Sequence, residues 1–174
     1  AKKIQEPSSV FAFNYDPLAN TDDGSCIFLA IGTPYQGGII FYLDGNGGGL
    51  IASFSDQSTG AEWGCYGTDL PGADGWGIGE GAQNTIDILN GCTQSGIAAQ
   101  LCNDLIVTSN GQVYDDWFLP SIQVVEIMIQ TLPISGIYFS STEHNGSEVY
   151  VPIMGMWMPF PKNSPAHVRA IRAF

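Results

Sequence analysis

Positively charged residues are scarce in this sequence. Its 174 residues include 17 acidic and only 5 basic side chains, which gives a formal net charge of −12. The basic residues are Lys2, Lys3, Lys162, Arg169 and Arg172. A protein that follows a phosphate backbone needs a stripe of Lys and Arg on one face. So few basic residues, two of them at the N-terminus, cannot form such a stripe, and we expect no nucleic-acid partner.

Several motifs with known chemistry are also missing. No run of about 18 apolar residues occurs, so we expect no membrane insertion. The sequence has only two histidines, His144 and His167, and no Cys-x-x-Cys pair, which excludes a His-rich metal site, a zinc ribbon and a thioredoxin-type site. Neither Gly-x-Ser-x-Gly nor His-Glu-x-x-His is present. We therefore expect a protein that is not an enzyme and requires no cofactor.

The cysteines indicate where such a chain works. There are four, Cys26, Cys65, Cys92 and Cys102. An even number in a Gly-rich, acidic chain favours disulfides and an extracellular location, on a cell surface or a virion surface. We expect Cys65, Cys92 and Cys102 to lie near one another, with a disulfide that joins Cys65 or Cys92 to another member of this group. The chain starts at Ala1 without a signal-peptide pattern, so we expect a processed protein or a piece of a longer one.

Residues 1–34 form a turn-rich arm. Asn14-Tyr15-Asp16-Pro17 and Asn20-Thr21-Asp22-Asp23-Gly24 combine the residue types that stabilise turns through their own side chains. The oxygen-bearing side chains among them are Asp16, Asn20, Asp22 and Asp23. They offer ligands for Ca²⁺, although their spacing is not that of an EF-hand. The alternative is a cluster of Asx turns without a metal.

Residues 35–174 have the pattern of an α+β domain. Two apolar runs, 38–43 and 50–54, flank a Gly/Asn turn and predict a β-hairpin, and a Gly-rich loop without regular structure is expected over 56–81. Three short helices follow. The first carries Ala82, Ile86 and Leu89, the second Ile97, Leu101 and Leu105 after Ser95, and the third Ile122, Val125, Ile129 and Leu132 after a capping Ser121. Strands are expected at 137–141, 149–151 and 168–174. The order predicts a small twisted antiparallel sheet whose first and last strands lie close together.

Several motifs in this domain resemble one known family. They are Gly37-Gly38-Ile39-Ile40-Phe41-Tyr42, Ala61-Glu62-Trp63-Gly64-Cys65, Asp116-Trp117-Phe118-Leu119-Pro120-Ser121, Tyr138-Phe139-Ser140-Ser141-Thr142-Glu143 and Val168-Arg169-Ala170-Ile171-Arg172-Ala173-Phe174. In this order they resemble bacterial extracellular domains of unknown function related to the C-terminal domain of a Legionella collagen-like adhesin. The resemblance implies a C-type-lectin-like fold. The arm is similar to a short repeat, Asn-Tyr-Asp-Pro followed by Asp-Asp-Gly-Ser-Cys, of Bacteroidetes surface proteins.

Two residue sets carry the predictions about contacts. In the first, we expect Glu143 to form a structural ion pair with Arg169 or Arg172. The second is the segment from Val149 to Pro161, which is apolar and contains three of the four methionines. Its candidate interface or ligand-binding residues, with the polar pair that follows, are Tyr150, Met154, Met156, Trp157, Met158, Phe160, Lys162 and Asn163. Prolines 152, 159 and 161 argue against a regular sheet here.

Two functions remain open for this surface. In one, the chain is a structural subunit of an extracellular filament or virion, and the segment packs against the chain itself or another surface protein. In the other, it is an adhesin that binds a glycan or a host receptor as a monomeric or trimeric tip module. The alternative structural interpretation is that the segment folds back over its own core.

Overall fold

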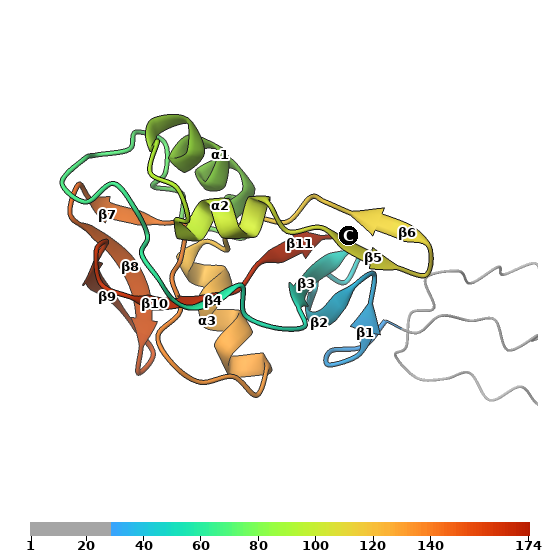
Figure 1. Ribbon diagram of the computed structural model, residues 1–174. Coiled ribbons are helices and arrows are strands. Elements are labelled where there is room, and N and C mark those ends of the chain that lie inside the picture. Colours follow the sequence, from blue (N-terminus) through green and yellow to red (C-terminus); the bar gives the residue numbers. More distant parts are fainter. Residues whose placement is uncertain (1–28) are drawn as a thin grey trace, which may run out of the picture.

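The computed structural model describes residues 29–174 and confirms a mixed α/β domain with three helices and small antiparallel sheets (Figure 1). The strands are β1 Pro34–Tyr35, β2 Gly38–Leu43, β3 Gly49–Ser53, β4 Ser58–Ala61, β5 Val107–Ser109, β6 Gln112–Tyr114, β7 Glu143–Asn145, β8 Glu148–Ile153, β9 Met156–Pro161, β10 Ala166–Val168 and β11 Ile171–Ala173. The helices are α1 Gly81–Gly91, α2 Ala98–Asn103 and α3 Ile122–Thr131. The proposed calcium ligands Asp16, Asn20, Asp22 and Asp23, and Cys26, lie outside the described residues.

The strands form four separate sheets instead of the one expected. They have the orders β1-β2-β3-β11, β4-β10, β5-β6 and β7-β8-β9. The hairpin β2–β3 is where the sequence predicts it, and the terminal strand β11 pairs with β3. The strand predicted as the first, β2, and the last strand β11 lie in one sheet but do not pair, because β3 lies between them. The rings of Tyr35 and Phe174 lie 5.0 Å apart. The expected domain boundary after residue 34 falls within β1.

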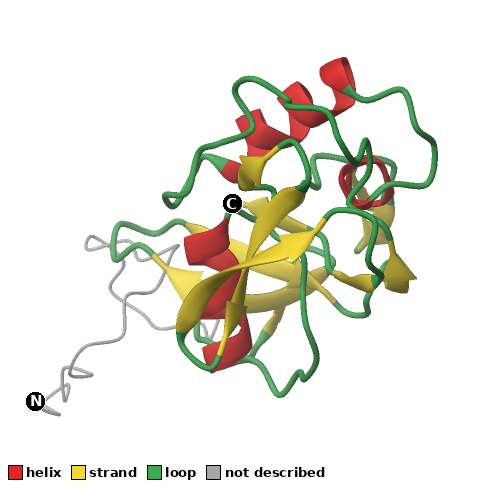
Figure 2. Ribbon diagram, turned by 90° about the vertical axis from the view of Figure 1, so that its left-hand side faces the viewer, coloured by secondary structure: helices red, strands yellow, loops and turns green. Residues whose placement is uncertain are grey.

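The core has two parts, one on each side of the β4–β10 ribbon. Helix α3 packs against both β2 and β8, whereas α1 and α2 lie on the other side of β4 and β10 (Figures 1 and 2). One cluster fills the space between α1, α2 and β8 around Trp63, Ile88 and Phe139. The other fills the space between α3 and the four-stranded sheet around Phe41 and Met128. Each helix thereby buries one face, which short helices need because they are marginal on their own.

Some predicted strands are wrong in detail. Residues 137–141 form no strand, and Tyr138 makes only an isolated bridge to His167. The closing strand is broken into β10 and β11, which belong to different sheets. The break follows from the course of the chain, since the terminal segment passes from the ribbon beside β4 to the edge of β3. Within the loop expected to lack structure, β4 pairs with β10.

The helices lie where expected but use different residues. In α1 the inward positions are Asn84, Thr85 and Ile88, which leaves Ile86 exposed. Helix α2 begins at Ala98 after Ile97, so Ser95 is not its cap. In α3, Met128 takes the buried place expected for Ile129.

Ser121 lies at the N-terminus of α3 but does not cap it through its side chain. Its hydroxyl donates instead to the Gly77 carbonyl at 2.8 Å. The sequence suggests a cap because it shows only local spacing, whereas the competing acceptor comes from a loop 44 residues earlier.

Candidate functional site

The segment from β8 to β9 is a regular hairpin, so the expectation that its prolines forbid a sheet is wrong. Six residue pairs join the strands, and Met154 and Gly155 form the turn with φ of 52° and 76°. The Tyr150 N–H donates to Thr142 O on the side away from β9. The Tyr150–Pro159 pair is therefore a non-hydrogen-bonded pair. Because hydrogen-bonded and non-hydrogen-bonded pairs alternate along an antiparallel ladder, the Pro152–Trp157 and Glu148–Pro161 pairs are non-hydrogen-bonded as well. The prolines occupy positions whose N–H would not bond across the hairpin.

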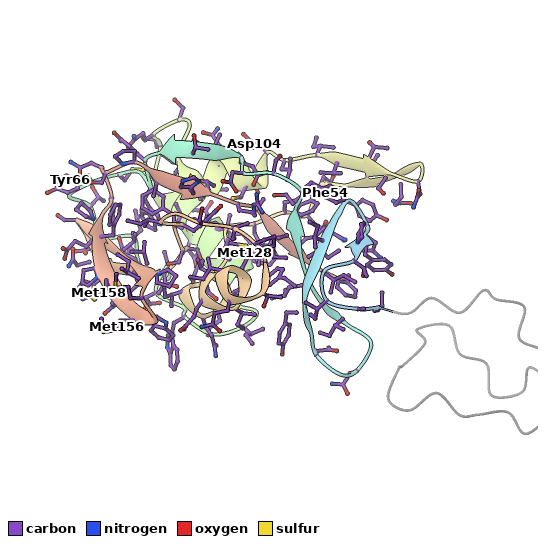
Figure 3. The ribbon with its side chains drawn as sticks, turned by 90° about the horizontal axis from the view of Figure 1, so that it is seen from below. Phe54, Tyr66, Asp104, Met128, Met156 and Met158 are labelled. Carbon is purple, nitrogen blue, oxygen red and sulfur yellow. A yellow bond between two sulfur atoms is a disulfide. The ribbon has the colours of Figure 1, made fainter. Side chains whose placement is uncertain are left out.

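The two faces of the hairpin differ in what they contact. On one face Val149, Val151 and Phe160 point into the core, where the Phe160 ring lies 5.9 Å from that of Phe139. Met158 and Met156 continue this row beyond the core and are 40% and 59% exposed, while Met154 at the turn is 95% exposed. Figure 3 shows Met156 and Met158 next to each other at the periphery of the molecule. The methionines therefore form an exposed ridge, which we call the methionine ridge (Met154, Met156, Met158).

The opposite face of the hairpin borders a pocket of about 240 Å³. Its lining residues are Asp74, Trp76, Ile122, Thr142, Tyr150 and Trp157. The indole rings of Trp76 and Trp157 meet edge to face with centroids 5.8 Å apart. Trp157 Nε1 donates to Glu126 Oε2 at 2.9 Å, which ties the ring to the middle of α3. Trp157 is 37% exposed, so it belongs to this pocket and is not enclosed in the core.

Trp76 was not among the predicted site residues. Trp63 in the same loop is buried in the core, whereas Trp76 is 58% exposed. The glycines on both sides of Trp76 are a signal that could have marked it, because Gly-Trp-Gly leaves a large ring with little local cover.

The backbone beside Trp76 is held by hydrogen bonds from buried polar side chains. Asn84 accepts from Gly75 N–H at 3.1 Å and donates to Gly75 O at 2.6 Å. The Thr142 hydroxyl donates to the same Gly75 carbonyl at 2.8 Å. The Gln123 N–H donates to Trp76 O at 3.3 Å. The ring is exposed, but its position is fixed by a satisfied network of hydrogen bonds.

Lys162 is not a surface residue, contrary to the prediction that placed it at the interface. It is 0% exposed, it forms an ion pair with Glu143, and its Nζ donates to Thr68 O at 2.8 Å and lies 4.6 Å from the centroid of a Trp63 ring. Glu143 also accepts from the Leu70 N–H at 3.0 Å. A buried ammonium needs such partners to remain charged. Asn163, the other polar candidate, is exposed.

The prediction that Glu143 pairs with Arg169 or Arg172 is wrong, because the partner of Glu143 is Lys162. Arg169 Nε donates to Asp56 at 2.7 Å, and Arg172 forms a two-pronged pair with Asp116 at 2.6 and 2.8 Å. The reason is positional, because the break between β10 and β11 directs the two arginines to carboxylates in the 56 and 116 loops. The Arg172 guanidinium also lowers the pKa of Asp116 from its ordinary value, mainly through this hydrogen bond.

Asp56 is the centre of a second polar cluster. Besides Arg169 it accepts from the Tyr138 hydroxyl at 3.1 Å and lies 2.9 Å from His167 Nδ1. A Cβ on Gly136 would lie 2.7 Å from His167 Nε2, so Gly136 allows the chain to pass close to this ring. The cluster ties β10 to the segment after β3.

The Tyr138–Asp56 contact predicts a loss of stability in alkali. Burial, followed by the Asp56 carboxylate, raises the pKa of Tyr138 to about 12. An unfolded tyrosine has a pKa of about 10. The folded state therefore holds the proton more tightly, so this stabilisation is complete below pH about 10 and is lost as the pH rises to about 12. We expect the melting temperature to fall in this window, and less steeply in Tyr138→Phe. An equal fall in Tyr138→Phe and in the control Tyr66→Phe would contradict the assignment.

Cys65 and Cys92 form a disulfide, which confirms a bond within the predicted group, and Cys102 is a buried free thiol whose pKa is raised by desolvation. Within residues 29–174, no set of three His, Cys, Asp or Glu side chains is arranged to hold a metal ion. No helix in the same range is long and apolar enough to cross a membrane. The sequence matches no protein-family model, and no curated protein matches it significantly.

Proposed function

We propose that this protein is an extracellular, non-enzymatic assembly module with a C-type-lectin-like fold, which associates with a second copy of itself through the methionine ridge. The Cys65–Cys92 disulfide supports an oxidising location. The observation that carries the proposal is the exposure of three methionines in a row at the edge of a hairpin. Flexible, polarisable methionines are typical of surfaces that pack against a partner.

The uncharged surface of this segment is where a second copy can bind against the least repulsion. The chain has a net charge of −12, so two copies repel each other over most of their surfaces. The segment from Val149 to Pro161 contains no charged residue, and two copies can approach there with the least repulsion. A structural subunit of a cell-surface filament or virion would use such a contact. A glycan is the weaker alternative for the ridge, because sugar hydroxyls need polar partners that methionines do not supply.

The test is self-association of a double variant, Met156→Ser with Met158→Ser. Each substitution loses about 1 kcal/mol of apolar burial, and both copies of the dimer carry both substitutions, so we expect association to weaken by roughly 1000-fold. Sedimentation equilibrium over a concentration series measures this, with circular dichroism to confirm the fold. Trp157 is a poorer choice for substitution because it contacts Trp76 and Glu126 within its own subunit.

The matched control is Ile86→Ser with Ile106→Ser, which removes two exposed apolar side chains elsewhere on the described surface. This variant should associate as the unmodified protein does. A protein that stays monomeric at every concentration would refute the proposal and favour the receptor-binding tip module. Unchanged association of the methionine variant would show that another surface mediates assembly.

A further inference from the structure

The lining of the pocket beside Trp76 has little to offer an anion and much to offer a cation. Three of its six lining residues are aromatic, and the only charged one is Asp74. The electron-rich faces of Trp and Tyr attract positive charge, as does a carboxylate. None of the four ion pairs within residues 29–174 includes Asp74, which is exposed at the pocket.

Two of the other polar groups of the pocket are already occupied. The Thr142 hydroxyl accepts from the Ile122 N–H at 3.0 Å and donates to Gly75 O. Trp157 Nε1 is bound to Glu126. The groups left for a ligand are the ring faces, the Asp74 carboxylate, the Tyr150 hydroxyl and Trp76 Nε1, so Asp74 supplies the only charge. A sugar, which needs several donors and acceptors, would find few partners there.

We propose that this pocket binds a small organic cation that carries a methylated ammonium group. The rings of Trp76, Trp157 and Tyr150 contact its methyl groups, and the Asp74 carboxylate balances its charge. A fully methylated, quaternary ammonium such as that of choline fits this lining better than a lysine-type ammonium, because it has no N–H groups that would need acceptors, and it is less strongly hydrated. The surrounding negative charge of the chain raises the local concentration of such a ligand.

Preorganisation supports this use of the pocket. The loop that carries Trp76 is fixed at Gly75 by Asn84 and at the Trp76 carbonyl by the start of α3, and Trp157 is held by Glu126. Rings that are already placed lose little conformational entropy when a ligand enters. The Tyr150 ring is supported from its side by His144, with centroids 4.6 Å apart.

The first experiment is a titration of the full chain with choline, followed by tryptophan fluorescence and by NMR chemical shifts. We expect saturable binding with a dissociation constant on the order of 1 mM, as for an open site with a few cation–π contacts. The neutral isostere of choline, in which carbon replaces nitrogen, should bind at least about tenfold more weakly if charge is recognised. Phosphocholine should also bind more weakly, because its phosphate approaches Asp74. Equal binding of the neutral isostere would show that the pocket recognises only apolar groups and would overturn the proposal. The absence of choline binding, or a preference for phosphocholine, would also overturn it.

The second experiment tests the assigned residues. Trp76→Ala and Asp74→Asn should each weaken choline binding about fivefold or more. Tyr66→Ala and Asp104→Asn are matched controls, since both residues are exposed at other places on the surface, and both variants should bind as the unmodified protein does (Figure 3). Met156→Ser with Met158→Ser should leave choline binding unchanged, so failure of self-assembly and failure of this site are distinguishable. Full choline affinity in folded Trp76→Ala would overturn the assignment.

Discussion

Replacing Lys162 with methionine is expected to lower the free energy of unfolding by about 3–5 kcal/mol. Lys162 is fully buried and pairs with Glu143, whose side chain is itself only 9% exposed. Methionine has a similar length and still packs against Trp63, so the main loss is electrostatic. The substitution leaves the Glu143 carboxylate desolvated without its counter-charge. Urea unfolding measures the effect.

The double variant Lys162→Met with Glu143→Gln separates charge from packing. Glutamine retains an oxygen that can accept from the Leu70 N–H but carries no charge. It should therefore recover much of the stability lost in the single variant. A single variant that loses less than about 1 kcal/mol would show that this ion pair is not essential to the core.

Removing the disulfide with Cys65→Ser and Cys92→Ser is expected to cost about 3 kcal/mol. The bond closes a loop with a sequence separation of 27 residues, which includes the Trp76 segment. Without it the unfolded chain gains conformational freedom that folding must again remove. Thermal unfolding of the unmodified protein with and without reductant gives the same comparison independently.

Alkylation and intact mass provide the chemical check of this bond. In the folded protein without reductant, neither disulfide cysteine should be alkylated, and buried Cys102 should be protected. After reduction and unfolding all four cysteines should react. Cys102→Ala is the control for the variant, because it removes a sulfur without opening the loop. Alkylation of Cys65 or Cys92 in protein that has been unfolded without reductant would contradict the disulfide.

The sequence predicts this fold well where local pattern and burial agree. The β2–β3 hairpin has two apolar runs around a Gly/Asn turn, and it forms as predicted. The helices lie in the right segments because apolar spacing and flanking Gly or Pro define them. Their inward residues are less predictable, since Asn84 and Thr85 are buried where they form hydrogen bonds with Ser141 and Leu119, which are distant in sequence.

The candidate site could be predicted only in part. The apolar composition of the segment after Val149 correctly suggests exposed methionines and Trp157. The same composition cannot show that all three prolines fall in non-hydrogen-bonded pairs of the hairpin, because the register depends on the partner strand. It also cannot show that Lys162 turns inward to Glu143, or that Trp76 meets Trp157 from a loop about 80 residues away. These contacts depend on tertiary neighbours.

The positions of Pro159 and Pro161 in β9, both in non-hydrogen-bonded pairs with β8, affect how this protein behaves at high concentration. Among the described residues β9 is an edge strand, and its N–H groups that point away from β8 would come from residues 157, 159 and 161. Two of these residues are prolines, so only Trp157 has an N–H to offer a newly arriving strand. An apolar edge with all its donors would be a template for cross-β growth. Here the side chains remain available to a partner while the backbone is closed to strand addition, so the chain can display an apolar ridge with little tendency to form amyloid through it.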